Sequence, residues 1–127
     1  MNAVVATVAG SFAVDLDDGE VAPFEGDLPP SAAPALNLPR LVAAAAAGST
    51  VVAVVATKPP LAVSHDGGLT WRSSGRGLPD GRAVAIDPDD PDVVLYGARN
   101  RLYLSRDGGV FWTALPPELP EIVAVSF

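Results

Sequence analysis

The sequence SHDGGLTW at Ser64–Trp71 decides the fold, because it returns as SRDGGVFW at Ser105–Trp112. The serine, the aspartate, both glycines and the tryptophan recur in register, 41 residues apart. A fixed period of about 40 residues is the sequence signature of a repeat architecture. The two motifs therefore predict that the chain is built from similar structural units.

Each motif has the composition of a tight hairpin. Asp66 and Asp107 can accept hydrogen bonds from the N–H groups of the following turn, and the glycines can adopt the positive φ angles that such a turn needs. Trp71 and Trp112 then begin the returning strand with a large apolar anchor. A strand, turn and strand are therefore expected around each motif.

Both copies match the pattern Ser-x-Asp-x-Gly-x-x-Trp at every defined position. In this the chain resembles the Asp-box, or bacterial neuraminidase repeat, family of β-propellers, which includes sialidases, photosystem II assembly factors and sortilin-type receptors. The resemblance implies that the motif is a structural hairpin between the third and fourth strands of a blade, away from the ligand face. The residues given this structural role are Ser64, Asp66, Gly68, Trp71, Ser105, Asp107, Gly109 and Trp112.

Composition favours a single all-β domain. The 127 residues are 49% hydrophobic, yet 13 prolines and 12 glycines divide them into short runs, as turn-rich β architectures require. The net charge of −7, with only eight Lys and Arg, argues against a nucleic-acid partner. The absence of cysteine excludes disulfides and thiolate metal sites.

The most hydrophobic stretch, residues 41–56, invites comparison with a membrane span. It is shorter than the roughly 20 residues that a spanning helix needs, and Gly48, Ser49 and Thr50 interrupt it. Two buried strands joined by a turn are predicted instead, with no membrane partner. The N-terminus lacks the basic start of a secretory signal, so a cytoplasmic location is expected.

A third, degenerate copy of the motif is predicted at Asp15–Gly19. Asp17 and Gly19 align with the motif's aspartate and glycine, whereas Asp15 replaces serine and Ala22 replaces tryptophan. A calcium loop is the alternative, although the glycine comes too early for an EF-hand and no glutamate closes the loop. A second landmark also occurs three times, as Leu38-Pro39, Leu78-Pro79 and Leu119-Pro120.

These landmarks predict three four-stranded propeller blades within one domain, residues 1–127. The first blade combines residues 122–127 with residues 1–24, the second covers 40–75 and the third covers 82–114. A proline-rich inserted loop occupies residues 25–39. In this arrangement the chain begins at a second strand and ends on a first, innermost strand.

Three blades are too few for a closed ring, since propellers typically have about four to eight. We therefore expect a homodimer with six blades, in which residues 121–127 of each subunit complete the first blade of its partner by strand exchange. Such an exchange would hide unpaired strand edges. The alternative is that the chain is a piece of a longer propeller.

Charge is predicted to be segregated between the two ends of the blades. The loops on the side opposite the motifs hold Arg40 and six ligand-binding candidates, which are Lys58, Arg76, Arg82, Arg99, Asn100 and Arg101. A surface of one sign attracts an oppositely charged ligand, so an anionic small molecule, a carbohydrate or a protein partner would bind there. The alternative is that these side chains only solvate the loops.

Two acidic segments are candidate sites. Residues 87–92 contain four aspartates and two prolines, an order typical of a turn, and a structural turn is favoured over a metal site. The inserted loop carries Glu25 and Asp27. Long loops inside compact domains are either functional or simple insertions, and the sequence leaves both readings of this loop open.

No catalytic residue, cofactor or metal is assigned. A sialidase would need an arginine clamp, a Tyr–Glu pair and an acidic proton donor, but Tyr96 and Tyr103 lie within strands and are expected to pack. The carboxylates on the ligand side are Asp80, Glu118 and Glu121, and nothing in the sequence pairs any two of them.

The single histidine, His65, occupies a variable motif position, where a surface residue is expected. Two functions remain. One is a non-catalytic binding or assembly module, and the other is a sialidase-like glycoside hydrolase with its site at the dimer axis.

Overall fold

The structure is a computed structural model that describes residues 1–26, 28 and 34–127. These residues form three four-stranded antiparallel sheets and no helix. The first sheet has the order β12 (Ile122–Ser126), β1 (Asn2–Thr7), β2 (Gly10–Asp15), β3 (Val21–Pro23). The second has the order β4 (Leu41–Ala47), β5 (Thr50–Val55), β6 (Leu61–Ser64), β7 (Arg72–Ser74). The third has the order β8 (Ala83–Asp87), β9 (Asp90–Gly97), β10 (Leu102–Ser105), β11 (Thr113–Ala114).

The all-β prediction with three four-stranded units is confirmed, and so is the interpretation of the most hydrophobic stretch. Residues 41–56 form the hairpin β4–β5, which turns at Gly48, where φ is +58°. In the described part of the chain, no helix is long and apolar enough to cross a membrane.

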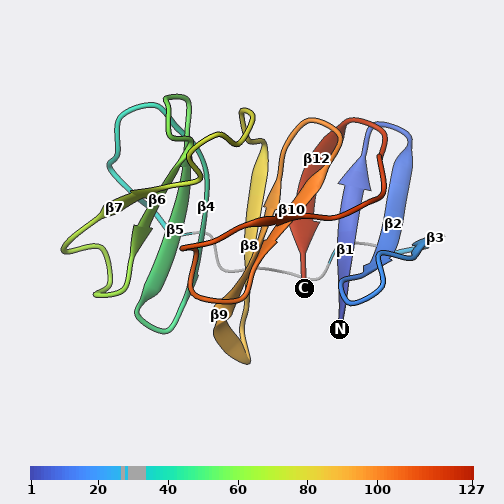
Figure 1. Cartoon of the computed structure of the whole chain (residues 1–127), viewed down its shortest axis with the longest axis horizontal. Helices are drawn as coiled ribbons and strands as arrows, with labels where there is room; N and C mark the ends of the chain where they lie inside the picture. Colours follow the sequence, from blue (N-terminus) through green and yellow to red (C-terminus); the bar gives the residue numbers. More distant parts are fainter. Residues whose placement is uncertain (27, 29–33) are drawn as a thin grey trace.

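The third sheet lies between the other two. Its strand β8 contacts both β4 and β12, so the three first strands stand next to one another, and Figure 1 shows the sheets side by side in this order. Because both faces of the third sheet are covered, β9 is buried continuously from Val93 to Gly97. This explains why β9 is an apolar run without the alternation of a half-exposed strand.

Two hydrophobic cores hold the sheets together. Leu95 and Leu102 of the third sheet pack in one core with Val5 and Val14 of the first sheet. On the opposite face, Val94 and Tyr96 share the other core with Val52, Val54 and Leu61 of the second sheet. The pleat of β9, which sends successive side chains to opposite faces, divides the apolar residues between the two cores.

The structure corrects the prediction of strand exchange between subunits. Strand β12 pairs with β1 of the same chain, in the register Val5 with Val125 and Ala6 with Ala124. The C-terminal strand therefore completes the first sheet within one molecule. Within the described residues, β12 stands at the edge of this sheet and pairs with its own β1.

The inserted segment, residues 25–39, lies in the connection between the two end sheets of the array. Strand β3 lies at one end of the array and β4 belongs to the sheet at the other end (Figure 1). The connection from Pro23 to Leu41 thus joins the two end sheets, whereas the connections after β7 and β11 join neighbouring sheets. Glu25 is exposed, whereas Asp27 lies outside the described residues.

The degenerate third motif is also a hairpin turn, and it joins β2 to β3. The Asp15 carboxylate accepts hydrogen bonds from the N–H groups of Asp17 at 2.8 Å and Asp18 at 3.4 Å. The Gly19 N–H donates to the Asp15 carbonyl, with a φ of +75° at Gly19. Aspartate thus takes over the serine's task of capping the turn.

Candidate functional site

The two motif hairpins, defined as residues 64–71 and 105–112, are held by side chains that bond to their own turns. In the first, the Ser64 hydroxyl donates to Asp66 at 2.7 Å and accepts from the Gly68 N–H at 2.8 Å. The Asp66 carboxylate accepts from both the N–H and the hydroxyl of Thr70. The Trp71 indole N–H donates back to the Gly68 carbonyl at 3.1 Å.

The second hairpin repeats the serine–aspartate part of this network and differs in the other partners. Asp107 accepts from Ser105 at 2.8 Å and from the N–H groups of Val110 and Phe111. The Trp112 indole, however, donates across to Ser74 of β7 at 3.0 Å. This tryptophan therefore ties the third sheet to the second.

The hydrogen bonds of both motif aspartates stabilise their charged forms. Those from Thr70 are the largest cause that lowers the pKa of Asp66 to about 2, and the bond from the Phe111 N–H leads the lowering of the pKa of Asp107. A carboxylate so engaged with its turn is a poor proton donor or acceptor near neutral pH. Both motif aspartates therefore stabilise the turns of their own hairpins.

The basic residues predicted to attract a ligand are mostly neutralised by carboxylates. Lys58 pairs with Asp80 at 2.8 Å, and Arg101 pairs with Glu118 at 3.1 Å. Glu121 receives Arg99 at 3.2 Å and Arg82 at 3.7 Å.

The structure thus brings Arg82 and Arg99 together on Glu121, while Lys58 and Arg101 form separate pairs. Asp80, Glu118 and Glu121, the three carboxylates considered for glycoside chemistry, are each bound to a basic side chain. Arg76 lies elsewhere, in a cavity between the second and third sheets.

The two tyrosines pack as expected. The Tyr96 ring is completely buried and lies 6.1 Å from the Tyr103 ring and 5.9 Å from the Trp112 ring, measured between centroids. Its hydroxyl donates to the Pro79 carbonyl at 2.7 Å. Burial raises the pKa of this phenol, so it stays protonated and structural.

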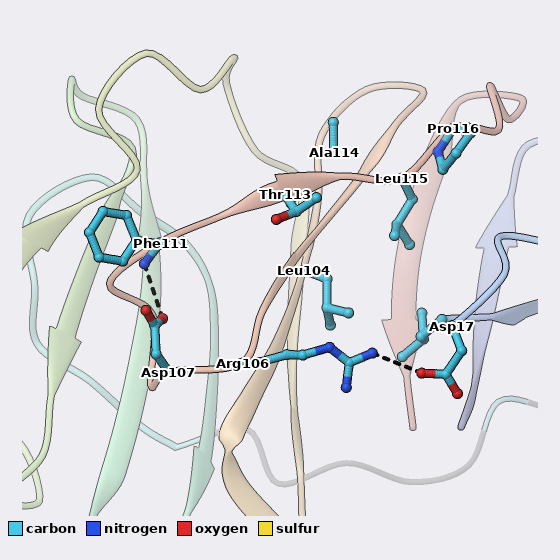
Figure 2. Close-up of a pocket in the computed structure, with 10 residues that line it drawn as sticks. Asp17, Leu104, Arg106, Asp107, Phe111, Thr113, Ala114, Leu115 and Pro116 are labelled. Atoms are coloured by element: carbon cyan, nitrogen blue, oxygen red, sulfur yellow. Dashed lines mark hydrogen bonds and ion pairs between the residues drawn. The ribbon is translucent and has the colours of Figure 1, made fainter.

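A cavity of about 580 Å³ lies between the third sheet and the turn of the first sheet. Leu16, Leu104 and Leu115 give it an apolar lining. Figure 2 shows Arg106 reaching from the second motif hairpin toward Asp17, which it meets in an ion pair of 3.0 Å. The Phe111 ring, 76% exposed, stands on the opposite side of the cavity.

The charged groups of this cavity are already paired. Asp17 bonds to the N-terminal ammonium group at 3.1 Å, which is the first cause that lowers its pKa, and Arg106 adds to the effect. Asp107 is engaged by its own turn. The cavity can therefore take up an apolar group beside a fixed ion pair, but its charged groups are not free for proton transfer.

Sequence reasoning missed Arg106 because it occupies the variable second position of the motif, as His65 does in the other copy. The signal available was a charged, long side chain next to the invariant aspartate. Only the packing of the first sheet beside this hairpin gives Arg106 a partner.

Comparison of the chain with protein-family models, with curated proteins and with solved structures found no match in any of the three.

Proposed function

We propose that the chain is a non-catalytic binding or assembly module made of Asp-box β-propeller blades. The observation that supports this is the open array of sheets. The third sheet is covered on both faces, whereas in the described residues no sheet lies on the outer face of the first or of the second. An array with two such ends is suited to assembly.

The outer faces of the two end sheets carry small, half-buried side chains. On the second sheet, Ala44 and Ala46 alternate with core residues of β4 and so face outward. On the first sheet, Ala13 and Ala124 occupy the outward face. Small residues let another sheet approach closely, so the two ends can pack against the opposite ends of a second copy.

Two copies related by a twofold axis would form a ring of six blades. In this dimer the first sheet of one subunit packs on the second sheet of its partner, and the same contact occurs twice. Strand β12 remains in its own chain. A carbohydrate ligand or a protein partner would bind at the loops that carry Lys58, Arg82, Arg99 and Arg101, whose charges are balanced by carboxylates.

The test is the mass of the full chain in solution, measured by sedimentation equilibrium over a range of concentrations. We expect twice the chain mass of 12.9 kDa. A single species at 12.9 kDa at every concentration would contradict the assembly function. Electron microscopy of the dimer should then show a closed ring with six blades.

The alternative, a sialidase-like glycoside hydrolase, has no observation in its favour. Retaining glycosidases need two carboxyl groups about 5 Å apart with one of them free to donate a proton. Here Glu118 and Glu121 each bind an arginine. If the unaltered chain hydrolysed a chromogenic sialoside and Glu121→Gln lost that activity, the result would support the glycoside hydrolase function instead.

A further inference from the structure

A second cavity, about 270 Å³, lies between the outer strands of the second sheet and the turn of the second motif hairpin. Arg72 of β7, Arg76 just beyond it and His65 of the first motif hairpin line this cavity. The opposite wall is backbone of Gly108 and Gly109. Three side chains that can carry positive charge thus converge on one hollow in a chain whose net charge is −7.

Among the residues that the structure describes, the two arginines of this cavity have no carboxylate partner. Across residues 1–26, 28 and 34–127, Lys58, Arg82, Arg99, Arg101 and Arg106 all form ion pairs.

Within the same described residues, three basic side chains form no ion pair: Arg40, Arg72 and Arg76. Of these three, only Arg72 and Arg76 share a cavity.

Nearby carboxylates do not neutralise the arginines. Asp66 shares a neighbouring hollow with His65 and Arg72, but its oxygens are taken up by Ser64 and Thr70. Asp92 lies beside Gly108 on the far wall and forms no ion pair within the described residues. The guanidinium groups therefore remain available to a ligand from solution.

The walls of the cavity are held in place by contacts between the two sheets. The Ser74 hydroxyl donates to the Gly109 carbonyl and accepts from the Trp112 indole at 3.0 Å. Gly108 has a φ of +75° and lies so close to His65 that a Cβ there would stand 3.0 Å from the imidazole Cε1. Strand β7 and the hairpin thus form one preformed surface.

We propose that this cavity binds a phosphate-type oxyanion, either free phosphate or a phosphate monoester. Such a group carries about −1.5 to −2 charges at neutral pH, which matches the two unpaired guanidinium groups. Guanidinium also bonds to phosphate oxygens in a bidentate way. A monocarboxylate would neutralise only one of the two arginines. The His65 ring adds a further donor at the rim.

The test is a titration of the intact, ¹⁵N-labelled chain with inorganic phosphate, followed by NMR at constant ionic strength. We expect saturable shifts of the Arg72 and Arg76 side-chain signals and of the Gly108 amide. Arg72→Gln and Arg76→Gln should each raise the phosphate Kd at least about fivefold, as expected for loss of a charge-assisted hydrogen bond. Arg106→Gln, which removes an arginine already paired with Asp17, is the matched control and should leave the Kd unchanged.

Phenyl phosphate, methyl sulfate and acetate separate the ligand classes. Tighter binding of phenyl phosphate than of inorganic phosphate assigns the cavity to phosphate monoesters, and the reverse assigns it to the free anion. Equal affinity for acetate or methyl sulfate would overturn the match to a dianion. Absence of saturable shifts, or an unchanged Kd in both Arg72→Gln and Arg76→Gln with native-like spectra, would overturn the site.

Discussion

At the scale of single residues, the motif aspartates stabilise hairpin turns by accepting hydrogen bonds from neighbouring residues. Asp66 is exposed yet accepts three hydrogen bonds from Ser64 and Thr70. These bonds exist in the folded chain only, so they link the protonation of this group to folding.

We expect Asp66→Asn to lower the melting temperature at pH 7 and to weaken its dependence on acid. The pKa of Asp66 falls to about 2 in the folded state, below the unfolded value of about 3.9. The stabilisation is therefore fully present above pH 4 and is lost as the pH falls toward 2. Thermal denaturation at pH 7 and pH 2.5 measures this, and the exposed Glu25→Gln serves as control. Equal acid sensitivity in Asp66→Asn and the unaltered chain would refute the linkage.

Gly81 illustrates a position where the absence of a side chain is required. A Cβ at this residue would overlap the Tyr96 ring, and that ring cannot move freely because its hydroxyl is bonded to Pro79 and its faces meet other rings. We expect Gly81→Ala to cost about 1–3 kcal/mol in the free energy of unfolding.

Urea denaturation checks this expectation, and Gly97→Ala is the comparison. A Cβ at Gly97 would meet Ile122 at 3.2 Å, a contact that small shifts can relieve. The loss should therefore be smaller than in Gly81→Ala. A larger loss at Gly97 would mean that the Tyr96 ring is free to move.

At the scale of elements, the closure of the first sheet is the decisive feature. Strand β12 follows β11 in the chain but pairs with β1, which comes from the other terminus. This pairing within one chain replaces the exchange between subunits expected from the sequence. The chain order of the strands is the same in both arrangements, so sequence alone does not distinguish them.

The double variant Ala6→Cys/Ala124→Cys reports on this closure. The two residues are directly paired, at a separation that a disulfide can span, and the chain has no other cysteine. Oxidation should give a cross-linked single chain of 12.9 kDa on a non-reducing gel. A covalent dimer as the main product would instead support the exchange of β12 between subunits. Either single variant controls for random cross-linking.

At the scale of the whole molecule, the two outer sheet faces govern assembly in our proposal. We expect Ala44→Glu to reduce the dimer to monomer, because it places an unpaired charge in the contact between two sheets, where burial is costly. Sedimentation equilibrium measures the change. Ala114→Glu on the exposed strand β11 is the control and should leave the mass unchanged. An unaltered dimer in Ala44→Glu would place the interface elsewhere.

Much of the architecture could be read from local patterns. The motif positions predicted the hairpins, and apolar runs between turn residues predicted the strands, since both depend on neighbours in the chain. The candidate sites were less accessible. Arg76 was recognised as basic, but its cavity partner Arg72 was not, because their convergence depends on how β7 packs against another sheet.

The amino-acid sequence by itself determined an all-β chain of three repeated units, because turn chemistry and strand periodicity act over a few residues. The tertiary structure alone decided which ends meet, which cations are neutralised and which remain free. The packing of the three sheets decides that β12 pairs with its own β1 and that Arg106 meets Asp17. It also decides that Arg72 meets no carboxylate in the described part of the chain. Contacts between residues so far apart in the chain leave no periodic trace in the sequence.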